Sequence, residues 1–235
     1  MTETETRRSF QDQLTEIRAE VVELAVDVSE QIGAATQALL DADLALVDAI
    51  YEARNRIGTR GHQLEQHVYQ LFALQQPMAS DLRAMLAVLR IVHEIELTAG
   101  LMRNVARATR RLYPRALPPR IRGLIERMGQ QAADQIRVAI DAFADSDERK
   151  ATALPDMDDV MDDLQKELFR AIFAGFAGEP VDEAQLQMAV QLAFVGRDYE
   201  RAADHAVMIG RWVTFMVTGL LPGDEDEAAG GAIVP

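Results

Sequence analysis

Apolar side chains recur every three or four residues along most of this chain. From Phe10 the spacing continues without a break to Leu39, through Leu14, Ile17, Val21, Leu24, Val28, Ile32 and Ala35. Such a period places the apolar residues on one face of an amphipathic α-helix. The same spacing predicts further helices from Asp43 as far as Pro77, and over residues 78–112, 120–144, 156–176 and 182–221. Alternating patterns and Asn-Gly or Asp-Gly hairpin turns are absent from the sequence, so the predicted fold class is all-α.

The predicted helices fall into two similar halves. An offset of 104 residues aligns apolar with apolar positions and, with more weight, acidic with acidic positions. The acidic matches are Asp41 with Asp145, Asp43 with Asp147, and Glu96 with Glu200. We therefore predict two tandem antiparallel three-helix bundles, residues 1–113 and 114–221, related by an internal repeat and joined at a proline-rich segment. The acidic tail, residues 222–235, is predicted to be disordered.

Composition narrows the range of functions. The 235 residues carry a formal net charge of -14, which argues against nucleic acid as a partner because phosphate contacts need a concentrated basic surface. Cysteine is absent, which excludes disulfides, zinc knuckles, iron–sulfur clusters and thiol nucleophiles. The longest uncharged stretches fall short of the roughly 20 apolar residues that a spanning helix needs. The N-terminus shows no apolar signal core, so we expect a soluble protein without membrane insertion.

Two pairs of carboxylates stand out in the second half. Asp158 and Asp162 are four residues apart on one predicted helix, and Glu200 and Asp204 are four apart on the next. This spacing points both members of a pair to the same side of their helix. Two such pairs facing each other would repel unless a cation lay between them, and carboxylate oxygens suit Mg²⁺, Mn²⁺, Ca²⁺ or iron. On spacing alone, a solvated acidic surface is the simpler interpretation.

The first half does not repeat these pairs. Its equivalent positions hold, in the same order, Arg54, Gly58, Glu96 and Gly100. Only Glu96 retains a carboxylate, and Arg54 supplies a positive charge where a cation would lie. A site of this kind is therefore predicted in the second half alone.

Catalytic constellations are not evident in the sequence. The histidines lack the spacing of a helical metal clip, and His205, directly after Asp204, is interpreted as structural or as a support for a ligand. A glycine-rich phosphate loop and a Ser-His-Asp arrangement are both missing. Di-iron carboxylate enzymes use Glu-x-x-His motifs, which this sequence lacks. We predict no catalytic residues and no enzyme activity.

Three short runs carry a family resemblance. Residues 73–83 read Ala-Leu-Gln-Gln-Pro-Met-Ala-Ser-Asp-Leu-Arg and lie between the second and third predicted helices. Residues 198–206 read Asp-Tyr-Glu-Arg-Ala-Ala-Asp-His-Ala, which contains Glu-x-x-x-Asp, and Asp158 begins Asp-x-x-x-Asp. Together these runs resemble the signature and the paired metal motifs of the PhoU family, regulators of bacterial phosphate uptake. The similarity extends over about residues 7–221.

The resemblance implies both a site and a role. The residues that match the family's metal motifs are Asp158, Asp162, Glu200 and Asp204. The resemblance implies that they are ligands of iron, zinc, magnesium or manganese. It also implies a cytoplasmic homodimer that represses the phosphate response. The partners in such a role are a phosphate ABC transporter ATPase and a sensor histidine kinase. With the resemblance included, the metal site is favoured over the acidic surface.

Two other functions remain open from the sequence. A metal-free helical adaptor, a PhoU-like paralogue with a different partner, would use its acidic faces only for solubility. A di-metal carboxylate enzyme fits the sequence less well, because the expected histidines are missing.

Overall fold

The computed structural model describes residues 3–74, 77–175 and 182–222. Every regular element in these residues is an α-helix, which confirms the predicted fold class. The helices are α1 (Glu3–Asp41), α2 (Leu44–Leu74), α3 (Ala79–Leu112), α4 (Pro119–Asp145), α5 (Glu148–Thr152), α6 (Leu154–Ala174) and α7 (Glu183–Thr218). The predicted disorder of residues 222–235 lies outside the described residues, apart from Pro222.

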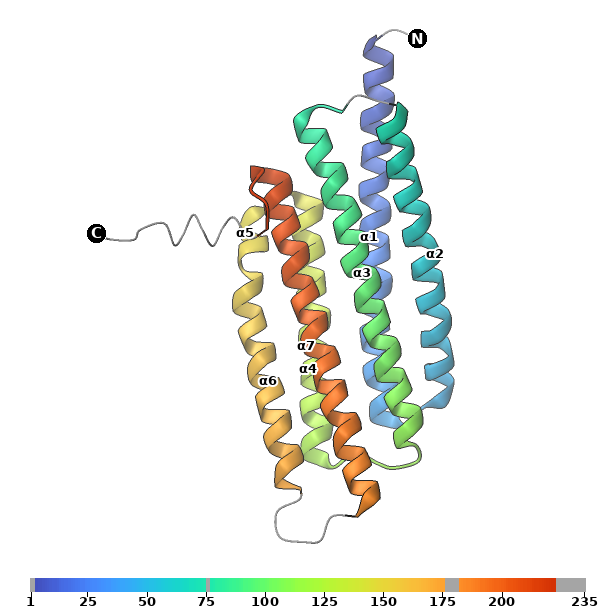
Figure 1. Cartoon of the computed structure of the whole chain (residues 1–235), viewed down its shortest axis with the longest axis vertical. Coiled ribbons are helices and arrows are strands. Elements are labelled where there is room, and N and C mark those ends of the chain that lie inside the picture. The colour runs from blue at the N-terminus through green and yellow to red at the C-terminus, as the bar shows by residue number, and fades with distance from the viewer. Residues whose placement is uncertain (1–2, 75–76, 176–181, 223–235) are drawn as a thin grey trace, which may run out of the picture.

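The long helices run side by side and form two bundles of three (Figure 1). The first bundle contains α1, α2 and α3, and the second contains α4, α6 and α7. Contacts between the bundles join α1 to α4 and α3 to α7, so these four helices are the inner ones. The outer helices are α2, which packs on α1 and α3, and α6, which packs on α4, α7 and the short α5. The predicted tandem architecture is confirmed.

The same turn follows the first helix of each bundle. Ala42 and Ser146 both adopt a left-handed conformation with a φ of 52°, which reverses the chain after α1 and α4. The next residues, Asp43 and Asp147, accept backbone N–H bonds from two residues further on, at 2.8 and 2.9 Å. Such side-chain caps satisfy the free N–H groups at a helix start. The 104-residue offset is therefore present in the local geometry as well as in the sequence.

The two bundles differ at the start of their middle helix. The sequence predicted one helix over residues 156–176, whereas the chain forms the single turn α5 and then α6, which begins at Leu154. Pro155 lies in the first turn of α6, where its missing N–H does no harm, and it restricts the residue before it. The equivalent residue of the first bundle is Tyr51, and α2 runs through it without a break.

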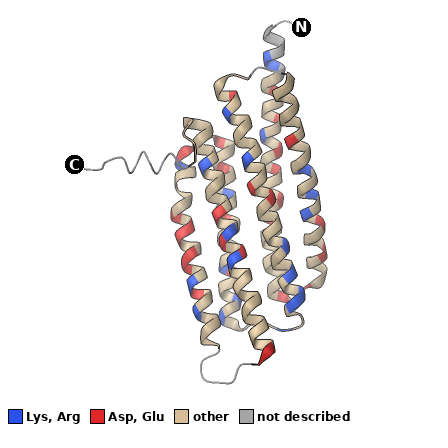
Figure 2. Ribbon diagram, in the orientation of Figure 1, with Lys and Arg blue, Asp and Glu red and all other residues tan. Residues whose placement is uncertain are grey.

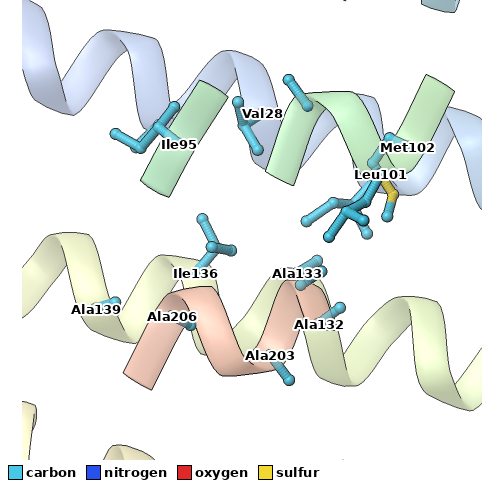
Figure 3. Close-up of a cluster of buried hydrophobic side chains, with 14 of the residues drawn as sticks. Val28, Ile95, Leu101, Met102, Ala132, Ala133, Ile136, Ala139, Ala203 and Ala206 are labelled. Carbon is cyan, nitrogen blue, oxygen red and sulfur yellow. The ribbon is translucent and has the colours of Figure 1, made fainter. Parts of the chain in front are cut away.

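Small side chains bring the two bundles together. Figure 3 shows Ala132, Ala203 and Ala206 of the second bundle in one hydrophobic cluster with Val28, Ile95 and Met102 of the first. All of these are fully buried, and alanine at such positions lets helix axes approach closely. This shared core fixes α7 against α3, and with it the helix that carries Glu200 and Asp204.

The ends of α7 are set by its own residues. The Asp182 side chain accepts the backbone N–H of Gln185, whose side chain accepts the N–H of Asp182, at 2.6 and 2.9 Å. This capping box starts the helix. Gly219, with a φ of 88°, ends it. Within the described residues no helix combines the length and apolar character that crossing a bilayer requires.

Candidate functional site

The four predicted ligands lie on two neighbouring helices. Asp158 and Asp162 follow one another by one turn on the outer helix α6, and Glu200 and Asp204 do the same on α7. The two helices are in direct contact, and acidic residues mark both in Figure 2. Three of the four side chains are partly buried and Asp204 is exposed. The site therefore lies at the margin of the α6–α7 interface, open to solvent on one side.

Burial and mutual repulsion act together on these carboxyl groups. Burial raises the pKa of Asp158 above its ordinary value, and the charge of Asp204 on the facing helix raises it further. Burial likewise raises the pKa of Glu200, with Asp204 and Asp162 adding to the effect. Each group thus responds to charge on the opposite helix, so the two pairs form one electrostatic cluster.

A glutamine beneath the cluster was not predicted from the sequence. Gln135 of α4 is completely buried, and its Nε2 donates to Oδ1 of Asp158 at 3.4 Å. Its Oε1 has no hydrogen-bond partner among the described residues. An unsatisfied buried oxygen is costly. The 104-residue offset could have drawn attention to Gln135. Its equivalent in the first bundle is Gln31, which is also buried on an apolar face.

Among the residues that the structure describes, one positive side chain forms an ion pair with the cluster. Arg197, one turn before Glu200 on α7, bonds to its Oε2, and Arg197 itself is largely exposed. Such a contact offsets little of the repulsion because solvent screens it. In the described parts of the chain, no three acidic or histidine side chains are already close enough to hold a metal ion.

His205 points away from the carboxylates and toward the first bundle. Its Nδ1 lies 2.6 Å from Oε2 of Glu94 on α3, and both side chains are largely buried. A buried carboxylate needs such a partner. The contact joins α7 to α3 across the two bundles, so His205 has a structural role here. No local pattern in the sequence could have identified Glu94, because the two residues are 111 positions apart.

The fold and the site together define a class of protein. Its members are all-α chains made of two three-helix repeats, with carboxylates on facing helices of a repeat. Comparison with known sequences places this chain more narrowly. The PhoU domain model matches residues 21–109 and 125–213, one copy in each bundle, and the chain belongs to the PhoU family.

Similar proteins match along nearly the whole chain. The phosphate-specific transport system accessory protein PhoU homolog 1 of Mycobacterium leprae is 33% identical over 93% of this chain and 97% of its own length. PhoU homolog 2 of Mycobacterium tuberculosis is 33% identical over 92% of this chain and 100% of its own. The crystal structure of PhoU from Pseudomonas aeruginosa superimposes with a TM-score of 0.83 at 26% identity, covering 90% of this chain and 100% of that one.

Proposed function

We propose that this protein is a non-catalytic accessory protein of phosphate uptake that represses the phosphate response. One observation carries the proposal: relatives named as accessory proteins of phosphate-specific transport match more than nine tenths of this chain, through both repeats.

We further propose that it acts in the cytoplasm as a homodimeric adaptor between a phosphate ABC transporter ATPase and a sensor histidine kinase. Exposed apolar side chains support a role in binding other proteins. On α7, Leu186, Val190 and Phe194 follow one another by single turns and are 57%, 43% and 60% exposed. On α3, the equivalent Leu82 and Leu86 are 39% and 40% exposed. Apolar stripes of this kind are typical of contact surfaces.

A metal ion at the second-repeat cluster is the third element of the proposal. Asp158, Asp162, Glu200 and Asp204 would be its ligands, drawn together by rotation of their side chains. The donor set consists of carboxylate oxygens, with the unpaired Oε1 of Gln135 nearby, and this chemistry fits a hard cation. Magnesium, manganese and iron fit it better than zinc, which favours nitrogen and sulfur. The ion would neutralise the cluster and tie α6 to α7.

Deletion of the gene in its own host tests the regulatory role. Cells that lack the protein should express alkaline phosphatase in high-phosphate medium, and the wild-type gene should restore repression. A variant with Leu186→Asp and Phe194→Asp, on the exposed stripe, should restore it poorly. Unchanged repression in the deletion strain would contradict the proposal.

Metal analysis of the purified protein tests the site. The variants Asp158→Ala and Glu200→Ala should lose most of the bound metal. Glu96→Ala is the matched control, because Glu96 is the first-repeat equivalent of Glu200, and it should retain the wild-type content. If all three variants hold as much metal as wild type, the cluster is only an acidic surface.

A further inference from the structure

The equivalent place in the first repeat is built differently. Arg54 and Gly58 lie one turn apart on α2, and Glu96 and Gly100 one turn apart on the neighbouring α3. A Cβ atom at Gly58 would lie 2.5 Å from Nη1 of Arg54, and one at Gly100 would lie 4.0 Å from its Nε. The guanidinium of Arg54 therefore lies over both glycines, in the space where second-repeat residues carry carboxylates.

Arg54 is held in this space rather than extended into water. Its Nε is buried and makes no hydrogen bond to any described residue. A guanidinium normally satisfies its N–H groups when it is desolvated. Arg54 thus leaves its buried Nε without a hydrogen bond and keeps its charge close to α2 and α3.

The group that needs this charge is Glu96. Burial raises the pKa of Glu96, and the charge of Arg54 is the largest opposing influence. Glu65 raises the pKa further, whereas His93 and His62 act with Arg54. Gly61 of α2 provides the room, because a Cβ atom there would lie 3.0 Å from Cδ of Glu96. Glu96 is thus pressed against α2, beside a permanent positive charge.

The two sites differ in the charged residues at their four equivalent positions. The second repeat brings together four carboxylates, whereas the first brings together one carboxylate and one guanidinium. These four positions of the first repeat carry no net charge without any ion from solution, and they lack three of the four oxygen ligands.

We propose that Arg54 is a built-in cation, which occupies in the first repeat the place of the metal ion proposed for the second. The first repeat then binds no metal, and its α2–α3 contact is independent of metal supply. The metal-binding part of this inference rests on the site proposed for the second repeat. The pairing of Arg54 with Glu96 does not.

A double-mutant cycle in chelator tests the pairing alone. Arg54→Met keeps the aliphatic stem and removes the charge, and it should lower the Tm by about 2–4 °C. In the Glu96→Gln background, which has no charge to neutralise, the same substitution should lower the Tm by less than half as much. Equal losses in the two backgrounds would overturn the pairing.

Metal-binding measurements test whether Arg54 occupies the place of a metal ion. In a background with Asp158→Ala and Glu200→Ala, bound Mn²⁺, Fe²⁺ or Zn²⁺, supplied separately, should fall to background. Adding Arg54→Asp, Gly58→Asp and Gly100→Asp should restore binding. A side chain at Gly58 would collide with the guanidinium of Arg54. Because Arg54→Asp removes that guanidinium, the substitutions can be combined.

The outcomes separate the two proposals. Residual metal that disappears with Glu96→Gln would mean that the first repeat binds an ion beside Arg54, which overturns the inference. A folded triple variant that binds no metal would overturn the equivalence of the two places. If the wild type binds no metal, the second-repeat site fails. The cycle in chelator then still decides the role of Arg54.

Discussion

The two repeats share a backbone plan but differ in how they balance their buried charges. In the first, burial raises the pKa of Glu96 at the α2–α3 contact and the charge of Arg54 opposes this rise, whereas in the second the carboxylates at the α6–α7 contact repel one another. The contact between the repeats shows the same contrast. Glu94 meets His205, but the equivalent pair is Asp198 and Leu101, and Asp198 bonds only weakly to Asn104 at 3.5 Å.

This comparison shows which features survive when a unit is duplicated. The apolar period and the Asp43 and Asp147 caps are retained in both copies, because each depends on residues within one helix turn. Polar contacts between helices have diverged, because each needs two residues from different elements to change together. The four substitutions below test individual differences between the repeats.

The largest effect is expected from Gly129→Ala in α4, which introduces the residue found at the equivalent Ala25. A Cβ atom at Gly129 would lie 2.8 Å from Cγ2 and 3.0 Å from Cβ of Thr36, so rotation of Thr36 cannot relieve the contact. The hydroxyl of Thr36 also hydrogen-bonds the buried Tyr199 hydroxyl at 2.7 Å. We expect a loss of about 2–3 kcal/mol in urea unfolding.

Gly123→Ala is the matched control in the same helix. A Cβ atom there meets nothing within 4 Å, so the substitution should stabilise the protein by about 0.5–1 kcal/mol through helix propensity. Equal effects at Gly123 and Gly129 would contradict the packing argument.

His205→Leu introduces the residue of the equivalent Leu101 and removes the partner of Glu94. We expect a loss of about 2 kcal/mol, because a largely buried carboxylate is left unpaired. Urea unfolding at pH 7 measures it. Combining the change with Glu94→Gln should recover part of the stability, and a double variant as weak as the single one would show that the loss arises from packing.

Asp198→Asn should stabilise the protein, and only above acidic pH. Burial raises the pKa of Asp198 from 3.8 to about 6. Between these values the folded chain holds a proton that the unfolded chain releases, so stability falls as the pH rises and the penalty is complete above about pH 6. Solvent exposure reduces the effect, and we expect a gain of about 1 kcal/mol at pH 8.

Urea unfolding in chelator at pH 4 and pH 8 measures this difference. The gain should vanish at pH 4, where the carboxyl group is largely protonated in the folded chain. The exposed Asp159→Asn is the control and should change stability little at either pH. A gain for Asp198→Asn that is the same at both pH values would exclude the titration.

The smallest effect is expected from Asp162→Asn in metal-free protein. Removing one of two like charges spaced by one turn should stabilise by about 0.2–0.5 kcal/mol at low salt, and 1 M NaCl should abolish the gain. Asp163→Asn, whose partner Lys166 lies at 3.0 Å, is the control and should bring no gain. A loss for Asp162→Asn in chelator would contradict the repulsion within the cluster.

Local patterns in the sequence predicted most of the fold. All nine apolar residues predicted for the core face of α1 are buried, because a helix repeats its contacts every three or four residues. Leu44 is an exception at 37% exposed, since it lies at the first position of α2. The short α5 was missed, because a single turn is too short to show a period.

The candidate site was predicted in part. Spacing along one helix placed Asp158 beside Asp162, and Glu200 beside Asp204. Because α6 and α7 are neighbours, carboxylates on one helix raise the pKa of carboxyl groups on the other. Gln135 and Glu94 were not found, because each meets its partner through packing of distant segments, which no local pattern encodes. The bound metal remains a prediction.

The position of α6 on the outside of its bundle has a consequence for hydrogen exchange. An outer helix opens more readily than the inner ones, so its amides exchange through partial unfolding. A ligand that bridges Asp158 and Asp162 to α7 adds its binding free energy to that opening step. Metal supply would then set how often α6 opens, whereas exchange in α2, which has Arg54 in place of a metal ion in our proposal, would not depend on metal. Of the two outer helices, α6 would then open at a rate that depends on metal concentration, and α2 would not.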